Sequence, residues 1–451
     1  MIREKLNKTI NYMKRNGVKK AVGMAYERLT AHYDMYYFYE PPTEEELERQ
    51  RGTVFEKMPL ISIVVPAYET REEFLTALID SVTAQSYENW ELIIADASES
   101  DRVKKCVEIA EKALSGRQAE RIKYRLLSKN EGISGNSNQA IVHASGDYIG
   151  LLDHDDLLTP DALFEMVKAV NTLAEQGISA KLLYSDEDKC DESGKNFREP
   201  NIKSGFNFDF LLANNYICHF LLLETGLMRQ LGFRPAYDGA QDYDLILRAV
   251  GRMREEEIAH IGRILYHWRC HDLSTAANPA SKLYAYEAGK RAVQAFLDEK
   301  GIDGRVEDTE HMGFYRVVYK PDLFAARKDV GALGGSVLDR NNKITSGILL
   351  QNGICPFAGL YGFFSGPANA ASVCRDVRTL DARTMILRGE DIPVFEEIMK
   401  VPYIGEIKER DRAYCNRLDE SIWRQRSLVL CAVFRERGQR LVWDPKIRVR
   451  R

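Results

Sequence analysis

The chain lacks several features that would place it in a special class of protein. It has 451 residues and only eight cysteines, which occur singly and never as C-x-x-C. We therefore predict reduced, mostly buried thiols rather than a disulfide framework or a zinc site. The 63 basic and 67 acidic side chains give a net charge of −4, which offers no general attraction to nucleic acid. A hydrophobic share of 45% excludes a disordered chain.

Long stretches without charge are also scarce. The first thirty residues contain no apolar core, so we expect no signal peptide and a cytoplasmic protein. Residues 344–374 carry no charge and would be long enough to cross a bilayer. Glycine and proline interrupt that stretch at seven positions, namely Gly347, Gly353, Pro356, Gly359, Gly362, Gly366 and Pro367. This composition predicts buried strands and tight turns instead of a membrane span.

Residues 1–58 change the sign of their charge along the way. The first 33 residues hold eight basic and two acidic side chains, and apolar residues recur there at helical spacing from Ile2 to Met13. We predict a basic amphipathic helix, which either makes a peripheral contact with the inner face of the cell membrane or packs on the main domain. An acidic stretch around Pro41 and Pro42 follows and is predicted to be a linker.

From residue 59, short apolar runs alternate with amphipathic segments. The runs cover residues 61–65, 92–95, 122–127 and 148–152, and helices are expected near 74–82, 103–114 and 161–173. Unbroken apolar strands between helices indicate a parallel sheet with helices on both faces. Ligands of such sheets bind outside the carboxyl ends of the strands.

Polar residues follow three of these strands. One group is Asp153-His154-Asp155-Asp156. In an extended segment, side chains two residues apart point the same way, so Asp153 and Asp155 could share a divalent cation. The alternative is that the cluster caps the next helix through Asp156 or Thr159. A second acidic cluster, residues 186–188, is either the edge of a site or a set of solvated turn residues.

Two further segments hold candidate chemistry. Asp242 precedes an apolar run and is expected in the first turn of a packed helix, as a general base or as an ordinary helix-start carboxylate. His267 and His271 would share one face of a helix, but the apolar residues 261–265 predict a strand, which makes a paired metal site doubtful. A structural role is the favoured interpretation for His271.

The motifs occur in a characteristic order along the chain. They are Ile61-Ser-Ile-Val-Val-Pro-Ala-Tyr68, Ser86 to Asp96, Asn130-Glu-Gly-Ile133, Gly146 to Asp156, Tyr184 to Asp188, Gln241 to Leu245 and Tyr266-His-Trp-Arg269. This order resembles the family 2 glycosyltransferases, which are inverting enzymes of GT-A fold that use nucleotide-activated sugars. The later motifs resemble a bacterial, rhamnosyltransferase-like branch associated with cell-surface polysaccharides.

The resemblance implies a fold class and a domain order. The fold is α/β: a Rossmann-like GT-A fold with a mostly parallel sheet and helices on both faces, plus a smaller C-terminal α/β region. The predicted domains are an N-terminal helix and acidic linker over 1–58, a GT-A domain over 59–277, a helical connector over 278–325 and a degenerate partial GT-A-like region over 326–451. The last region carries no carboxylate near Ser427, where a second catalytic acid would fall.

The resemblance also implies roles for individual residues. Asp242 matches the general base. The matching donor-binding residues are Pro66, Ala67, Tyr68, Glu69, Asp96, Asn130, Asn138, Asp153 and His154. The matching metal ligands are Asp153, Asp155 and His267, for Mg²⁺ or Mn²⁺, and the acceptor side is assigned to Trp268 and Asn215. Ala97 stands where many members carry a second aspartate, so base recognition at that position is in doubt.

The function implied is metal-dependent, inverting transfer of a sugar from a UDP- or dTDP-linked donor to a growing cell-surface glycan, either free or linked to a lipid. Two alternatives stay open at this point. One is a non-catalytic glycan-binding or scaffold protein that keeps the transferase fold, and the other is a sugar nucleotidyltransferase, which would release pyrophosphate.

Overall fold

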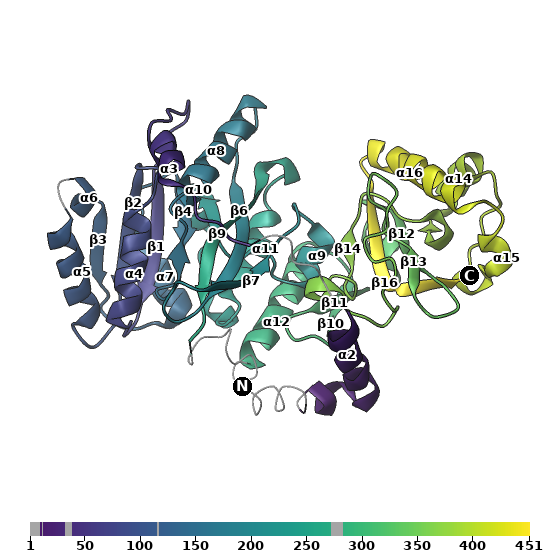
Figure 1. Ribbon diagram of the computed structural model, residues 1–451, viewed down its shortest axis with the longest axis horizontal. Helices are drawn as coiled ribbons and strands as arrows, with labels where there is room; N and C mark the ends of the chain where they lie inside the picture. Colours follow the sequence, from purple (N-terminus) through teal and green to yellow (C-terminus); the bar gives the residue numbers. More distant parts are fainter. Residues whose placement is uncertain (1–9, 11, 32–37, 115–116, 272–282) are drawn as a thin grey trace. The chain divides into compact units, whose positions relative to one another are not determined.

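The computed structural model describes residues 10, 12–31, 38–114, 117–271 and 283–451, and its arrangement is drawn in Figure 1. The chain divides into two compact units. The larger unit consists of Met35–Phe206 and Asn215–Phe296, and the smaller unit consists of Met1–Asp34, Asn207–Asn214 and Leu297–Arg451. The domain boundaries predicted from the sequence differ from this division at several points and stay a prediction.

The larger unit is built on a nine-stranded sheet of order β3-β2-β1-β4-β8-β6-β9-β5, with β7 paired to β6. Its strands are β1 (Ile61–Ala67), β2 (Trp90–Asp96), β3 (Ile122–Leu126), β4 (Tyr148–Leu151), β5 (Leu157–Leu158), β6 (Leu182–Cys190), β7 (Phe197–Asn201), β8 (Leu221–Glu224) and β9 (Ile258–Arg269). The first four strands in space are parallel, whereas β8 pairs antiparallel with both β4 and β6. All of the strand runs expected from the sequence are present.

Helices cover both faces of the parallel half (Figure 1). They are α3 (Glu44–Arg51), α4 (Glu72–Thr83), α5 (Arg102–Ala113), α6 (Arg117–Glu120), α7 (Gly132–Val142), α8 (Ala162–Glu175), α10 (Thr225–Leu231) and α11 (Gln241–Val250). One face, with Ile61 and Ile63, packs into a core shared with α4, α5 and α8, while α7 contacts β1 and β2 from the other side. The strands alternate their side chains between two faces, which explains why both sets are apolar.

The acidic stretch that we predicted as a linker contains helix α3. Thr43 and Glu46 form a capping box there, in which each side chain bonds the backbone N–H of the other residue. Gln50 of the same helix is buried and accepts a hydrogen bond of 2.6 Å from the Ser86 hydroxyl. The capping box satisfies the first N–H groups of the helix, and the buried contact fixes it to the larger unit.

The smaller unit contains a five-stranded sheet of order β13-β12-β16-β14, with β15 on β12, and a separate β10–β11 hairpin. The strands are β10 (Gly304–Asp308), β11 (Tyr315–Tyr319), β12 (Val330–Leu338), β13 (Ile344–Ser346), β14 (Arg375–Asp376), β15 (Ile386–Leu387) and β16 (Arg440–Arg450). The helices are α2 (Val18–Thr30), α9 (Phe208–Ala213), α13 (Leu323–Ala326), α14 (Ile392–Met399), α15 (Arg412–Cys415) and α16 (Glu420–Glu436), and α12 (Leu283–Glu299) crosses from one unit to the other.

The sequence of the smaller unit explains its core. Trp423 of α16 and Trp443 of β16 are almost fully buried together with the apolar residues of β12 and α14. The charge-free residues 344–374 form strand β13 followed by turns, as their glycines and prolines predicted. No helix among the described residues is both long enough and apolar enough to span a bilayer. Most of the amphipathic segment predicted near the N-terminus lies outside the described residues.

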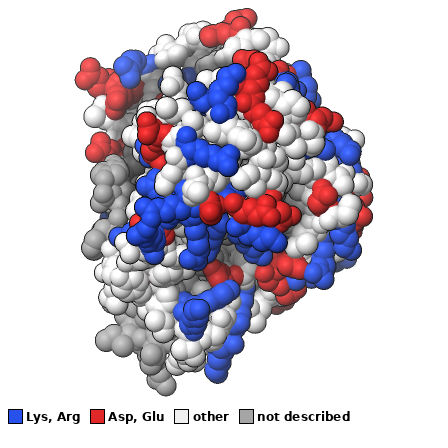
Figure 2. Space-filling model, turned by 90° about the vertical axis from the view of Figure 1, so that its right-hand side faces the viewer, with Lys and Arg blue, Asp and Glu red and all other residues white. Residues whose placement is uncertain are grey.

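Charge and cysteine are distributed unevenly over the fold. All eight cysteines are free and five of them are buried, which confirms the prediction of mostly buried thiols. Although the net charge is −4, Lys and Arg side chains gather in a band on the face drawn in Figure 2.

A buried carboxylate joins the strands of the parallel half. Glu91 of β2 accepts hydrogen bonds from the hydroxyls of Ser62 on β1 (2.5 Å) and Ser145 (2.8 Å), from the Ser145 backbone N–H (2.6 Å), and from Lys123 on β3. Burial opposes ionisation, but these donors outweigh it and lower the pKa of Glu91 to about 2. The contact therefore ties β1, β2, β3 and the entry to β4 together.

Glu91→Gln should reduce the free energy of unfolding by on the order of 3 kcal/mol at pH 7. Because the pKa of Glu91 lies below its ordinary value of 4.5, this stabilisation is complete above pH 4.5 and is lost as the pH falls towards 2. Urea unfolding of both proteins between pH 7 and pH 3 would show the difference shrinking with acid. Glu88→Gln, at an exposed site, is the control, and a constant difference at every pH would contradict the assignment.

Candidate active site

The D-x-D segment lies in a turn at the carboxyl edge of the sheet. Strand β4 ends at Leu151, and the backbone N–H of Asp156 donates to the carbonyl of Asp153 over 3.1 Å. The sequence predicted an extended segment for the two aspartates, and this prediction is wrong. They project from a turn, because the chain reverses direction between β4 and β5.

Asp156 fastens this turn to strand β9. Its carboxylate accepts hydrogen bonds from the Tyr266 hydroxyl and from the Arg269 backbone N–H, the latter over 2.7 Å. Burial, together with the charges of Asp155 and Asp153, raises the pKa of Asp156 well above its usual range. Arg269 adds a bond of 2.6 Å from Nε to the Asp155 carbonyl.

One interpretation of the sequence was that Asp156 caps the next helix. The structure does not form this cap, because both carboxylate oxygens of Asp156 accept hydrogen bonds from strand β9. No local pattern in the sequence indicates the role that Asp156 has in the structure. The carboxylate and the residues that bind it are more than a hundred positions apart, and only the pairing of β5 with β9 brings them together.

Asp153 and Asp155 keep carboxylate oxygens for a ligand. Among the described residues, none donates a hydrogen bond to the Asp153 carboxylate, and this side chain is exposed. Desolvation by the protein around it, and then the negative charges of Asp155 and Asp242, raise the pKa of Asp153. Carboxylates held close together without a protein cation are a suitable donor set for Mg²⁺ or Mn²⁺. Among the described residues, however, no group of three or more His, Cys, Asp or Glu side chains is arranged to hold a metal ion.

The two histidines that the sequence singled out take different places on and after β9. His271 approaches Asp155, with 2.7 Å between Nε2 and Oδ2. His267 is buried, bonds Asp188 through Nδ1, and stacks on Phe197 with 4.1 Å between ring centroids. The structure thus brings His271 to the D-x-D carboxylates and pairs His267 with strand β6. Residues 272–282, which follow His271, lie outside the described residues.

Asp242 lies in the first turn of α11, as the sequence predicted. Its Oδ2 accepts a hydrogen bond of 2.9 Å from the Asn215 side-chain amide, so the predicted base and one predicted acceptor residue are in contact. The Cys218 thiol is also bonded to Asp242, and burial followed by the charge of Asp242 raises the pKa of that thiol. The Oδ1 atom of Asn215 is buried without a partner among the described residues.

A buried ion pair holds the start of α11. Asp244 binds Arg248, one helical turn later, with 2.7 Å between Oδ2 and Nη2, and it also binds Arg234 from the preceding loop. Arg248 in turn donates to the carbonyls of Leu231 and Gly232. These bonds fix the loop before α11 and therefore the orientation of Asp242.

The residues assigned to the nucleotide are presented by β1 and β2. Ala67 and Asp96 are register partners at the ends of these strands. Tyr68 is 45% exposed, so one face of its ring is open to a ligand. Glu69 accepts hydrogen bonds from Ser100, which lower the pKa of Glu69 and tie the two strand-end loops together. Pro66 precedes this group in β1.

Several residues that we predicted to bind the nucleotide-sugar donor already form hydrogen bonds within the protein. Asp96 is fully buried and accepts from the Tyr124 hydroxyl (2.8 Å) and from the Ser98 backbone N–H (2.9 Å). The Asn138 amide is bonded at both atoms to the backbone of Phe233. Asn130 accepts bonds from the Gly132 N–H and the Asn136 amide. In contrast, the Nδ1 atom of His154 is buried and has no partner among the described residues.

The acidic cluster at residues 186–188 belongs to strand β6 and is buried. Asp186 accepts from His260 over 2.8 Å, Glu187 binds the buried Lys203, and Asp188 binds His267. The interpretation as solvated turn residues is wrong, because each carboxylate is enclosed and paired with a basic side chain. The cluster anchors the segments that carry the site. Trp268 is half-buried and packs beside the core, near His219.

Ligands of open α/β sheets bind outside the carboxyl ends of the strands, and the acidic side chains of the D-x-D turn lie at that edge. The sequence profile of Glycosyl transferase family 2 matches residues 62–232. This part of the chain is therefore a family 2 glycosyltransferase domain, and the resemblance seen in the motifs is confirmed.

Curated relatives match about half of the chain. "Uncharacterized protein y4gI" of Sinorhizobium fredii is 41% identical over 53% of this chain and 25% of its own length. "O-antigen biosynthesis protein RfbC" of Myxococcus xanthus is 32% identical over 58% and 20%, and "Chondroitin synthase" of Escherichia coli is 27% identical over 58% and 36%. The chain thus spans only a fifth to about a third of the length of these relatives.

Solved structures show a weaker likeness. A crystal structure of Staphylococcus aureus TarS 1-349 in complex with UDP has a TM-score of 0.40 and 18% identity, and covers 53% of this chain and 65% of that one. The mannosyltransferase PcManGT of Pyrobaculum calidifontis, in complex with GDP-Man and Mn²⁺, has a TM-score of 0.36 and 14% identity, over 57% and 81% of the two chains.

Tyr266→Phe should weaken nucleotide binding, because it removes one of the two donors that hold Asp156. The buried carboxylate would lose a hydrogen bond, at a cost of about 1–3 kcal/mol in the free energy of unfolding. Calorimetric titration with UDP, dTDP and GDP, together with thermal unfolding, measures both effects. Tyr184→Phe is a matched control, since this buried hydroxyl donates to the Ser204 carbonyl. Equal nucleotide affinities in the two variants would contradict the role given to Asp156.

Proposed function

We propose that this protein is an inverting, metal-dependent glycosyltransferase. It would move a sugar from a nucleoside diphosphate donor, UDP- or dTDP-linked, to a growing cell-surface glycan. The family 2 domain supports the transferase class. The names of the relatives, which include O-antigen and chondroitin proteins, support a polysaccharide as the product.

The observation that carries the proposal is the placing of Asp242. Its carboxylate is oriented by Asn215 and lies close enough to the D-x-D turn for its charge to raise the pKa of Asp153. A base in this position accepts the proton of an acceptor hydroxyl while the hydroxyl oxygen attacks the anomeric carbon. The bond from that carbon to the diphosphate breaks, and the nucleoside diphosphate leaves from the opposite face with inversion.

Asp153, Asp155 and His271 would hold the divalent cation. When bound, the cation offsets the negative charge that grows on the departing diphosphate. The chain's own contribution is to orient these groups: Asp156 and Arg269 fix the turn that carries both aspartates. His267 remains the ligand predicted from the sequence, and its bond to Asp188 favours a supporting role for it instead.

Asp242→Asn should lower the transfer rate by about 10²–10⁴-fold and leave nucleotide affinity unchanged. The amide keeps the size of the side chain but cannot accept the proton as a base. The readout is release of nucleoside diphosphate from a donor sugar in the presence of acceptor glycan, beside calorimetric nucleotide titration. Asp80→Asn, at an exposed position of helix α4, is the control. Release of pyrophosphate would instead favour a nucleotidyltransferase, and retained transfer would remove Asp242 as the base.

His271→Ala and Asp155→Asn should abolish the part of nucleotide binding that requires Mn²⁺, because His271 contacts the Asp155 carboxylate and both would hold the cation. His267→Ala should chiefly lower thermal stability, because it leaves the buried Asp188 without its partner. Titrations of UDP, dTDP and GDP with and without Mn²⁺ would compare the three variants. Loss of metal-dependent binding in His267→Ala alone would restore His267 as the ligand. Absence of binding to any nucleotide would favour the non-catalytic alternative.

A further inference from the structure

The smaller unit contains an open groove of about 1060 Å³. Its walls come from helix α2, from residues 307–316 and 362–374, and from the last residues of strand β16. All of these segments belong to one compact unit. A groove of this size exceeds the space that a single monosaccharide needs, and it suits an extended chain.

Strand β16 lines this groove with three cations. Lys446, Arg448 and Arg450 alternate along the strand, so they lie on one face at intervals of about 7 Å. All three are exposed, and none forms an ion pair with another described residue. Partial burial, and then the positive charge of Arg450, lower the pKa of Arg448, while the charges of Glu310 and Asp444 oppose this shift. Lys19 of α2, also on the groove wall, is likewise exposed and outside every described ion pair.

Cationic side chains outnumber acidic ones on the groove wall. The four acidic residues are Glu27, Glu307, Asp308 and Glu310, and the six cationic residues are Lys19, Lys20, Arg316, Lys446, Arg448 and Arg450. Three of the acids have other partners: Glu27 accepts from the backbone N–H groups of Ser365 and Gly366, Glu307 binds Arg305, and Glu310 binds Lys20. An excess of cations on a concave surface attracts anions and raises their local concentration.

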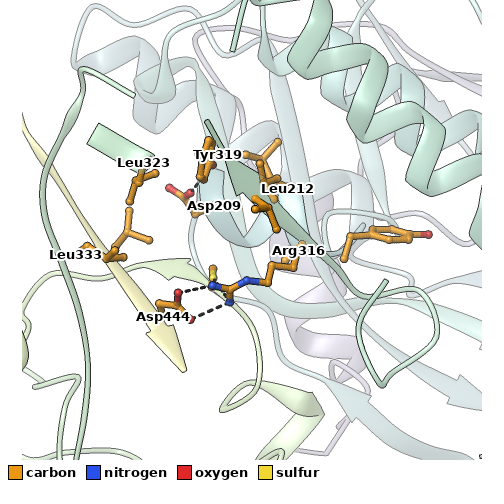
Figure 3. Close-up of a pocket in the computed structure, with 13 residues that line it drawn as sticks. Asp209, Leu212, Arg316, Tyr319, Leu323, Leu333 and Asp444 are labelled. Atoms are coloured by element: carbon orange, nitrogen blue, oxygen red, sulfur yellow. Dashed lines mark hydrogen bonds and ion pairs between the residues drawn. The ribbon is translucent and has the colours of Figure 1, made fainter. Parts of the chain in front are cut away.

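One cation of the groove wall, Arg316, is paired with a carboxylate. Arg316 reaches Asp444 with both terminal nitrogens, with 2.9 Å between Nη1 and Oδ1 (Figure 3). A smaller cavity of about 210 Å³ shares Arg316, Tyr315 and Cys374 with the groove, so the two hollows adjoin. Among the described residues, the groove cations outside ion pairs therefore belong to β16 and α2.

Aromatic rings form another part of the wall. Phe363 is 47% exposed and Tyr26 is 43% exposed. Phe363 stacks on Tyr361 with 5.4 Å between centroids and meets Phe364 edge to face at 5.1 Å, which holds its ring in place. Exposed, rigid rings offer flat apolar surfaces on which the C–H faces of sugar rings can pack.

We propose that this groove binds an anionic glycan chain, with the cations of β16 on its acidic groups and the rings at Phe363 and Tyr26 against its sugar faces. The inference rests on the proposed transfer to a surface glycan and deepens it, since the bound chain would be the growing acceptor. The acidic groups are either uronate carboxylates or phosphodiesters, because both meet a row of cations in the same way. The concave shape favours a chain over a flat bilayer surface.

The experiment compares binding by the full-length protein of four probes: unsulfated chondroitin, a poly(glycerol phosphate) chain, neutral dextran, and vesicles of phosphatidylglycerol. We expect binding of at least one anionic chain and none of dextran at about 50 mM salt. Lys446→Gln/Arg448→Gln/Arg450→Gln should weaken that binding about tenfold or more, and Phe363→Ala should weaken it as well. The preference between chondroitin and the phosphodiester chain identifies the acidic group.

The control is Lys104→Gln/Lys105→Gln/Lys112→Gln, which removes the same charge from helix α5 of the larger unit. Equal losses in the two triple variants would show unspecific attraction and overturn the proposal. So would an absence of binding to both anionic chains, or a triple variant on β16 that loses only vesicle binding. Nucleotide titration of the same preparations separates this outcome from failure of the proposed function, because the groove variants should keep wild-type nucleotide affinity.

Discussion

The bond between Asp156 and strand β9 is the contact on which the geometry of the site depends. A buried carboxylate must find donors, and Asp156 finds them in Tyr266 and the backbone of Arg269. This requirement fixes the turn after β4, from which Asp153 projects without a hydrogen-bond donor among the described residues and Asp155 contacts His271. A satisfied buried acid thus holds the turn that carries the other two acids.

Other buried carboxylates join elements of the larger unit in the same way. Glu91 links the parallel strands through Ser62, Asp186 and Asp188 bind residues of β9, and Asp244 holds the loop before α11. Each of these carboxylates is buried and paired with at least one protein side chain, whereas Asp153 is exposed and has no such partner among the described residues. Such a division between satisfied and unsatisfied acids gives a rigid support for a site, because the supporting bonds are stronger in a low dielectric. The proposed base, Asp242, is placed by this framework and oriented by Asn215.

The two units present opposite electrostatic problems. At the D-x-D turn, desolvation and the charges of Asp155 and Asp242 raise the pKa of Asp153, and there we propose a cation. Along β16, Lys446, Arg448 and Arg450 bring like charges to one face, and there we propose an anion. The proposed chemistry supplies both, through a divalent metal with its diphosphate at the first place and an acidic glycan at the second. The proposed glycan groove can therefore be tested separately in the smaller unit, which lies outside the matched residues 62–232 except for its segment Asn207–Asn214.

The sequence alone determined the α/β class, the strand runs and the family, because apolar periodicity and the order of short motifs are local properties of the chain. It also placed Asp242 in a helix start and the D-x-D at a strand end. Only the tertiary structure decided that Asp156 binds β9 and does not cap a helix, that His271 and not His267 meets Asp155, and that residues 186–188 are buried. These outcomes depend on contacts between residues about 80 to 115 positions apart, which strand pairing creates and no local pattern encodes.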